Sequence, residues 1–291
     1  MTTPHGGPEG VPVERRRPDS IDSMTWEPSE RWVRATKGEV TVVDSRRPVL
    51  VWEPGRPVPL YAFPAAEVRM DLLRRTERPA NPRRHGGATV FYDLALAELT
   101  VQAAAWTYPS EELADYISFE WFGHEVLDHW YEEDEEIFVH PRDPYKRVDA
   151  LPSTRHVQVE IEGTVVADTR TPVLLFETHL PVRYYIPRED VRLDLFTPTS
   201  ARTRCPYKGV ATDYWSWAGG ADVRPDIAWS YPDPLPSVWI IKDRVAFYNE
   251  SVDIVVDGAR QRRPVTFFSK PSLQSSGGPG ATAGRPDPEH A

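Results

Sequence analysis

Residues 170–177 read RTPVLLFE, and nearly the same string, RRPVLVWE, stands at residues 46–53. The prolines of the two strings, Pro48 and Pro172, are 124 positions apart (172 − 48). Each string places large and branched apolar residues together behind a proline, a composition typical of a buried strand. If the string belongs to a repeated structural unit, further pairs are expected at the same spacing.

Two more blocks recur at nearly that spacing. PAAEVRMDLL at 64–73 returns as PREDVRLDLF at 187–196, and AAWTYP at 104–109 returns as IAWSYP at 227–232, each 123 positions later (187 − 64 and 227 − 104). Three blocks in one order at one near-constant offset predict two copies of one domain, at residues 30–140 and 154–269. Residues 141–153 contain three prolines and polar flanks, so we expect a linker there.

The chain has 291 residues and 30 prolines, about twice the average proline usage. Such frequent prolines disfavour long helices and favour short strands joined by turns. Residues 1–24 and 275–291 are rich in proline, glycine and charge and poor in apolar side chains, which predicts disordered tails. The predicted fold is therefore mainly β: two tandem compact domains of short antiparallel strands with little helix.

Local patterns support this fold class. Val157, Val159 and Ile161 alternate with polar residues and are followed by Gly163, so residues 157–167 predict a hairpin, and residues 32–43 behave in the same way. PVLLFE and RYYIP predict one further pair of strands, and ATDYWSW predicts another strand. The strongest helical candidate is a short run that Ser110 can cap, containing Leu113, Tyr116 and Ile117.

Composition and charge exclude several function classes. The net charge of −10 and the pI near 5.4 argue against broad binding to nucleic acids or anionic membranes. One cysteine rules out an intrachain disulfide framework and a multi-cysteine zinc site. The first ten residues, MTTPHGGPEG, lack the apolar core of a signal peptide, and no apolar run reaches membrane-spanning length, so we expect a cytoplasmic protein.

The repeat indicates which residues both copies share. Arg192 and Asp194, equivalent to Arg69 and Asp71, are two positions apart and share one face if they lie in a strand. The arginine then either binds an anionic ligand or forms a structural ion pair. The aromatic residues near this region either pack in the core or line a pocket for a flat or cationic ligand: Tyr207, Tyr214, Trp215, Trp229 and Tyr231, with Trp106 and Tyr108 in the first copy.

The two copies differ at one short string. CPYKG at 205–209 corresponds to PRRHG at 82–86, so proline replaces Cys205 and His85 replaces Lys208. Only the second copy has a thiol, and the nearby ammonium of Lys208 would favour its thiolate form. The alternative is a buried cysteine that acts as a small apolar filler. Cys205 and Lys208 are therefore the candidate catalytic residues.

No metal site is predicted. His124, Asp128 and His129 adjoin an acidic run, but the two histidines are five positions apart, which suits neither a helix face nor a strand face. The chain contains no phosphate-binding glycine loop of the Walker type, no dinucleotide motif and no His-Glu-x-x-His string. The sequence therefore leaves the cofactor unassigned.

At CPYKGVATDYW, AWSYPDPLP and VAFYNESVD the sequence resembles the bacterial NTP_transf_9 family, domain of unknown function 427, and the resemblance covers both copies. It implies a small β-rich domain similar to the β-tent architecture, which elsewhere includes methionine sulfoxide reductase and aromatic-cage ligand binders. The family name implies nucleotidyl transfer, which needs a Gly-Ser turn and aspartates at Asp-x-Asp spacing. The chain has no Gly-Ser pair, and Asp190 and Asp194 are four positions apart.

Our leading hypothesis is a protein that binds a small molecule in an aromatic and arginine-lined cleft. In the second copy, Trp229 and Tyr231 would stack on the ligand, Arg192 would hold an anionic group, and Cys205 with Lys208 would line the mouth. One alternative is an enzyme active in the second copy only, by nucleotidyl or other group transfer or by thiol chemistry at Cys205. Another is an adaptor whose acidic surface recruits a basic partner.

Overall fold

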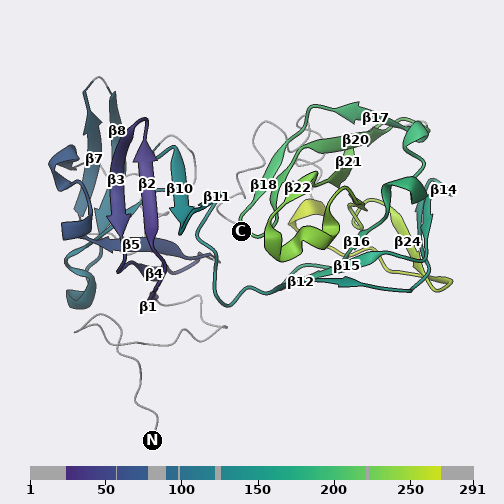
Figure 1. Cartoon of the computed structure of the whole chain (residues 1–291), viewed down its shortest axis with the longest axis horizontal. Helices are drawn as coiled ribbons and strands as arrows, with labels where there is room; N and C mark the ends of the chain where they lie inside the picture. The colour runs from purple at the N-terminus through teal and green to yellow at the C-terminus, as the bar shows by residue number, and fades with distance from the viewer. Residues whose placement is uncertain are drawn as a thin grey trace, which may run out of the picture. The chain divides into compact units, whose positions relative to one another are not determined.

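The structure is a computed structural model that describes residues 24–56, 58–77, 90–97, 99–121, 126–220 and 223–269 (Figure 1). The predicted disordered tails lie outside these residues except for Met24. The chain divides into two compact units between Asp143 and Pro144. Each unit is built from small antiparallel sheets, so the prediction of two tandem, mainly β domains is confirmed.

The larger sheet in the described part of the first unit has seven antiparallel strands in the order β1-β4-β5-β9-β8-β7-β6. The bounds are β1 Thr25–Pro28, β4 Val49–Trp52, β5 Leu60–Pro64, β6 Leu73–Thr76, β7 Val90–Leu96, β8 Leu99–Thr107 and β9 Tyr116–Phe119. All four residues of β4 are buried, as the apolar string VLVW predicts.

A smaller sheet in the same unit has the order β11-β10-β2-β3. The bounds are β2 Val33–Lys37, β3 Val40–Ser45, β10 His129–Glu132 and β11 Glu135–Ile137. Strands β2 and β3 form the hairpin predicted from alternation, and the turn uses Gly38 at φ +55°, where residues with a Cβ are strained.

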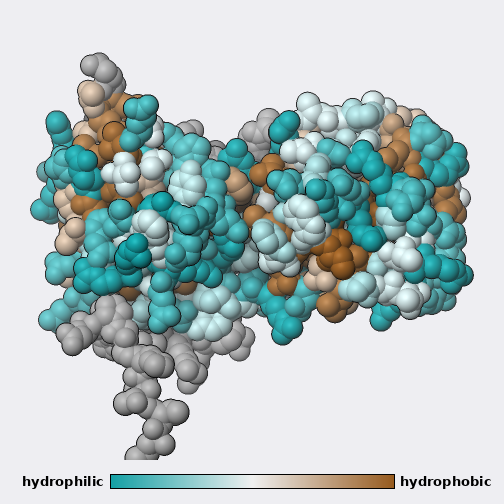
Figure 2. Space-filling view, viewed as in Figure 1, coloured by the Kyte–Doolittle hydropathy of each residue, from teal (hydrophilic) through white to brown (hydrophobic). Residues whose placement is uncertain are grey.

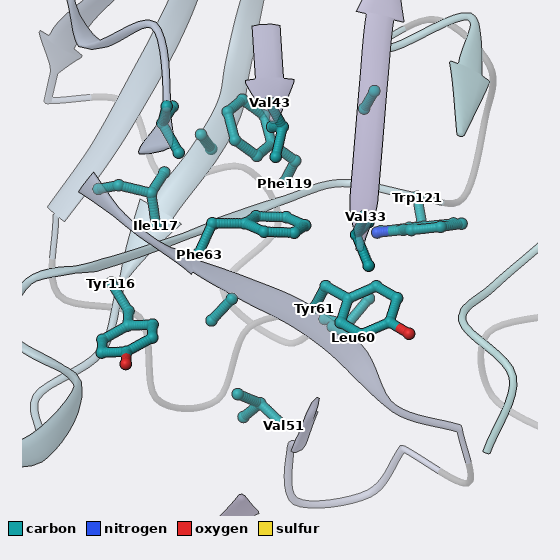
Figure 3. Packing of buried hydrophobic residues seen from close by; sticks show 14 of the residues in the cluster. Val33, Val43, Val51, Leu60, Tyr61, Phe63, Tyr116, Ile117, Phe119 and Trp121 are labelled. Atoms are coloured by element: carbon teal, nitrogen blue, oxygen red, sulfur yellow. The ribbon is translucent and has the colours of Figure 1, made fainter. Parts of the chain in front are cut away.

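The core of the first unit lies where these two sheets meet. Figure 3 shows Val33 and Val43 from the smaller sheet beside Phe63 and Phe119 from the larger one. The ring of Trp130, on β10, stacks on Trp121 with centroids 3.9 Å apart. These side chains are almost fully buried and supply the apolar area that stabilises the unit.

Helical structure in the described residues of the first unit is limited to three 3₁₀ turns, η1 Ala65–Glu67, η2 Met70–Leu72 and η3 Glu111–Leu113. The predicted helix after Ser110 is therefore only one turn long, and Ser110 makes no side-chain cap. Tyr116 and Ile117 belong instead to β9, where Ile117 pairs with Phe63 of β5. The prediction was wrong at these positions because pairing with β5 and β8 satisfies the backbone better than a short helix would.

The described part of the second unit contains four small sheets, ordered β12-β15-β16, β14-β13-β24-β25, β17-β20-β21-β23 and β18-β19-β22. The bounds are β12 Val148–Pro152, β13 Val157–Ile161, β14 Thr164–Thr169, β15 Val173–Glu177, β16 Arg183–Tyr185, β17 Phe196–Thr199, β18 Thr203–Cys205, β19 Gly209–Ala211, β20 Asp213–Trp217, β21 Arg224–Ser230, β22 Asp233–Pro234, β23 Val245–Phe247, β24 Asp253–Val256 and β25 Ala259–Arg260. The 3₁₀ turns are η4 Arg188–Asp190, η5 Leu193–Leu195, η6 Pro236–Ile241 and η7 Phe267–Ser269. The hairpin β13–β14 and the pair β15–β16 follow the sequence predictions.

Equivalent strands pair in equivalent register in the two units. Val49 of β4 faces Ala62 of β5, and Val173 of β15 faces Tyr185 of β16. Further along, Ala105 of β8 faces Phe119, as Ala228 of β21 faces Phe247. The sequence repeat is therefore also a structural repeat, and equivalent positions can be compared directly.

The predicted linker at 141–153 is largely built into the two units. Arg142 pairs with Glu132 at 3.1 Å in the first unit. Residues 148–152 form β12, which pairs along its length with β15. Val148 and Ala150 pack against the core of the second unit, and this burial stabilises β12 as the first strand of that unit.

Hydrophilic residues cover most of the face of each unit seen in Figure 2, with hydrophobic residues showing over β7 and β8. Leu99 is exposed in this region of the first unit, and Trp239 and Ile240 are exposed on η6 of the second. Among the residues described, no helix has the length and apolar character needed to cross a membrane.

Candidate functional site

The string CPYKG forms the tight turn between β18 and β19. Cys205 ends β18 and pairs with Gly209, the first residue of β19. The Lys208 N–H donates to the Cys205 carbonyl at 3.4 Å, which closes the turn. Gly209 has φ +94°, a backbone conformation that residues with a Cβ rarely adopt. The turn thus holds the thiol and the ammonium of the two catalytic candidates near each other.

The Lys208 side chain is buried against a carboxylate from another sheet. Its Nζ lies 2.5 Å from Oε2 of Glu177, the last residue of β15. The other carboxylate oxygen, Oε1, lies 3.3 Å from Nζ of Lys146. The Glu177 side chain is only 7% exposed, and that of Lys146 is 25% exposed. We call Lys146, Glu177, Cys205 and Lys208 the lysine–glutamate cluster.

In this cluster, two ammonium groups pair with a single carboxylate. Burial acts to lower the pKa of Lys208, but an ionised Cys205 and the Glu177 carboxylate raise it above its ordinary value. For Glu177, burial acts to raise the pKa, yet Lys208 and Lys146 bring it below the ordinary value. Both groups are therefore charged near neutral pH, and when Cys205 is a neutral thiol the cluster carries one surplus positive charge.

Three tyrosines border the cluster. Tyr185 of β16 is fully buried, and burial is the main cause that raises its pKa to about 12. Burial, followed by the neighbouring Cys205, also raises the pKa of Tyr231 well above the ordinary value. The ring of Tyr207 lies 5.5 Å from the Lys146 ammonium. The Tyr185 and Tyr231 hydroxyls remain protonated near neutral pH, so each is able to donate a hydrogen bond.

Trp229 lies beside this region but its ring is already in contact with other side chains. Its Nε1 donates to the Tyr185 hydroxyl at 3.4 Å. Its ring centroid is 4.5 Å from that of Tyr248 and 5.8 Å from the guanidinium of Arg183. Arg183 is fixed in turn by Glu250 through two contacts of 2.6 and 2.8 Å. The arginine next to Trp229 is thus Arg183, and the ring packs in the core.

The predicted pair Arg192 and Asp194 lies at the surface. The two side chains form an ion pair at 3.2 Å and are 56% and 66% exposed. They do not share a strand face, because Asp194 lies in the 3₁₀ turn η5 and Arg192 caps its start. The strand expectation fails because the chain changes direction here between two sheets. Val191 pairs with Ala167 of β14, whereas Phe196, in β17, pairs with Trp217 of β20. The structural ion pair is the alternative that the geometry favours.

Tyr214 and Trp215 point to opposite faces of β20, since side chains alternate along a strand. Tyr214 packs in the cluster that contains Trp229 and Tyr231, and its hydroxyl lies 2.5 Å from Oγ1 of Thr203. Trp215 packs in the other core, with the guanidinium of Arg188 5.0 Å above its ring. Of these two predicted ligand contacts, the structure places Tyr214 on the side of the lysine–glutamate cluster.

The first unit contains an equivalent carboxylate, Glu53, but its surroundings differ. Nε of Arg56 lies 2.8 Å from Oε2 of Glu53, and the Tyr108 hydroxyl donates to Oε1 at 3.1 Å. Tyr108 also accepts a hydrogen bond from Ser118 at 3.0 Å. The buried carboxylate of Glu53 is thus paired with a guanidinium, where Glu177 is paired with two ammonium groups.

The other first-unit candidates lie apart from that network or outside the described residues. Arg69 and Asp71 form an exposed ion pair at 2.6 Å, as their second-unit equivalents do. Trp106 is fully buried in the core. His85 lies outside the described residues.

Sequence reasoning missed Glu177, Lys146 and Tyr185. A signal for Glu177 was present, because both copies of the first repeat block end in glutamate, at Glu53 and Glu177. Lys146 lies in the string assigned to the linker, and Tyr185 occupies the position that Ala62 holds in the first copy. These residues meet only through tertiary structure.

The rejected metal candidates are engaged in ion pairs. Asp128 accepts from Lys37 at 2.7 Å, and Nδ1 of His129 lies 2.7 Å from Glu136. His124 lies outside the described residues. Within the described part of the chain, no three His, Cys, Asp or Glu side chains converge as metal ligands would.

Comparison with known proteins gives one family. The model of NTP_transf_9, described as a domain of unknown function (DUF427), matches residues 25–133 and 149–258. There is one match for each unit, and together they span more than half of the chain. No curated protein matches the chain.

Proposed function

The chain belongs to the NTP_transf_9 family of unknown function, and from that premise we propose that its second domain binds a small anionic molecule at the lysine–glutamate cluster. The ligand would supply a second negative charge to pair with the two ammonium groups. This proposal keeps the expected aromatic cleft with Tyr231 and Cys205 near the ligand. It assigns the anionic group to Lys146 and Lys208 instead of Arg192.

One observation carries the proposal: a buried carboxylate lies between two ammonium groups. A buried charge is costly to keep without a partner, so an excess cation favours a bound anion. The protonated hydroxyls of Tyr185 and Tyr231 add donors in the same region. Among the described residues of the first domain, the equivalent carboxylate of Glu53 pairs with the guanidinium of Arg56.

Isothermal titration with sulfate tests this proposal, using the full chain and two single variants. Lys146→Gln leaves Lys208 to neutralise Glu177, so we expect sulfate to bind about tenfold more weakly, roughly 1.4 kcal/mol. Lys242→Gln is the matched control, because Lys242 is exposed and its ammonium lies over Trp239. Equal affinities in all three proteins would reject the proposal.

A second candidate function is thiol chemistry at Cys205, and the partial exposure of that residue favours it. In such a reaction the thiol loses its proton to solvent and Sγ bonds to an electrophilic carbon, while the leaving group departs with the bonding electrons. The Lys208 ammonium would stabilise the thiolate. A free thiol of this kind suits a reducing compartment, and we accordingly propose a cytoplasmic location.

Alkylation by iodoacetamide separates the two candidates. The chain has one cysteine, so mass spectrometry assigns the label without ambiguity. If Cys205 is a nucleophile, it reacts at pH 7 about tenfold faster in the wild type than in Lys208→Met, because the thiolate loses its counter-ion. The same rate in both proteins removes the thiol enzyme and leaves the binding function untouched.

A further inference from the structure

The turn that carries Lys208 also places a second group of variable charge, the thiol of Cys205, in the lysine–glutamate cluster. Cys205 pairs with Gly209 across the turn, and its side chain is half-buried. Burial acts to lower the pKa of Lys208, and the next largest influence is an ionised Cys205, which raises it. A thiolate at Cys205 would therefore act on the same ammonium that pairs with Glu177 at 2.5 Å.

Two tyrosines adjoin Cys205 from other parts of the domain. Cys205 influences the pKa of Tyr185, on β16, and of Tyr231, which follows β21. Burial is the main cause that raises both pKa values, that of Tyr185 to about 12, so both hydroxyls stay neutral up to pH 9.5. Lys208, with a raised pKa, and Glu177, with a lowered one, stay charged. Thiols ionise near pH 8.5, within this range.

The charge of the cluster therefore depends on the state of the sulfur. With a thiol at Cys205, the ammonium groups of Lys146 and Lys208 are paired with the single carboxylate of Glu177, which leaves one surplus positive charge. With a thiolate, two negative charges offset the two ammonium groups and no surplus remains. An anion from solution and the thiolate thus neutralise the same surplus, and two anions beside each other repel in a partly buried site.

We propose that anion binding and ionisation of Cys205 oppose each other: the site holds its anion while Cys205 is a thiol, and it releases the anion when the thiol loses its proton to solvent. This inference rests on the anion site proposed above. By linkage, a bound anion also keeps Cys205 protonated, and it suppresses the thiolate, which is the nucleophilic form. Anion binding and thiol reactivity are then alternative states of one site.

Titration calorimetry with sulfate at pH 7 tests the role of charge at this position, using the full chain and two variants. Cys205→Asp carries a fixed negative charge and should bind sulfate about tenfold more weakly than the wild type. Cys205→Asn has the same size without the charge and should bind like the wild type. If the two variants have equal affinities while the wild type binds sulfate, the inference is wrong and the anion site stands. If the wild type binds no sulfate at pH 7, both are rejected.

The wild type and Cys205→Ser give a test that needs no charged substitution. Sulfate keeps its charge between pH 7 and pH 9.5, whereas a thiol of ordinary pKa is about nine-tenths ionised at the upper value. At constant ionic strength, the affinity of the wild type should fall about fivefold over this range, and that of Cys205→Ser should stay constant. The same pH dependence in both proteins would assign it to another group and overturn the inference.

The reciprocal effect is measured by alkylation of Cys205 with iodoacetamide as a function of pH. A tenfold preference of sulfate for the thiol form raises the midpoint of the rate profile by about one pH unit at saturating sulfate, compared at equal ionic strength. Lys146→Gln, which loses the surplus charge, should show a much smaller shift. A lower maximal rate with an unchanged midpoint would show that sulfate only shields the thiol sterically, which contradicts the inference.

Discussion

The buried ion pair of Lys208 and Glu177 affects the stability of the second domain. The lysine ammonium is 2.5 Å from the carboxylate and both side chains are almost completely buried. Removing one partner of such a pair leaves an uncompensated charge in the interior, which destabilises far more than the loss of a surface pair. The pair next to the Cys205 turn is therefore costly to break.

Glu177→Gln should lower the free energy of unfolding by about 3–5 kcal/mol, because it leaves the Lys208 ammonium buried without its counter-ion. Urea unfolding followed by fluorescence measures the change. Asp194→Asn is the control: its ion pair with Arg192 is exposed, so the effect should stay within about 0.5 kcal/mol. Similar losses in the two variants would contradict the assignment of the buried pair.

Glu177 should also make the free energy of unfolding depend on pH. The pKa of Glu177 is lower in the folded protein than its ordinary value of 4.5, because Lys208 and Lys146 outweigh the effect of burial. A carboxylate with a lowered folded pKa stabilises the protein above its unfolded pKa, and this contribution is lost as the pH falls through the folded pKa. The stability difference between wild type and Glu177→Gln should thus shrink as the pH drops below about 4.5. Unfolding curves from pH 7 down to pH 3 measure it, and a constant difference would contradict the linkage.

At the scale of elements, the β18–β19 turn positions the chemistry. Gly209→Ala should destabilise the protein by about 1–2 kcal/mol, since φ +94° is strained for a residue with a Cβ. It should also weaken sulfate binding, because the turn carries Lys208. Gly163→Ala is the matched control: φ is +78° with open space around it, so thermal melts should show a similar loss of stability while calorimetry shows unchanged binding. Equal binding by both variants would argue against a role for the turn.

The elements also show what could be predicted from sequence. Alternation of Val157, Val159 and Ile161 predicted the β13–β14 hairpin, because one face of that sheet is buried. The strand expectation for Arg192 and Asp194 was wrong because the chain turns there between two sheets. Glu177 was missed because its partner Lys208 lies 31 positions along the chain (208 − 177), in the turn between β18 and β19 of another sheet. Periodicity reports which face of an element is buried, but it does not report which elements meet.

At the scale of the molecule, each unit has its own apolar core. A chain that buries enough apolar surface within one unit folds without its neighbour. We therefore expect residues 144–291, expressed alone, to fold cooperatively and to keep the sulfate affinity of the full chain. Circular dichroism melts and calorimetry measure this, and an unfolded fragment would contradict the independence of the unit.

We propose that the surplus positive charge of the lysine–glutamate cluster binds an anion. The most direct measurement is the affinity of Glu177→Gln for sulfate, taken well below the melting temperature of that variant. Removing the carboxylate raises the surplus from one charge to two, so we expect this variant to bind sulfate about tenfold more tightly than the wild type does. Weaker or unchanged sulfate binding would show that the surplus charge does not hold the anion.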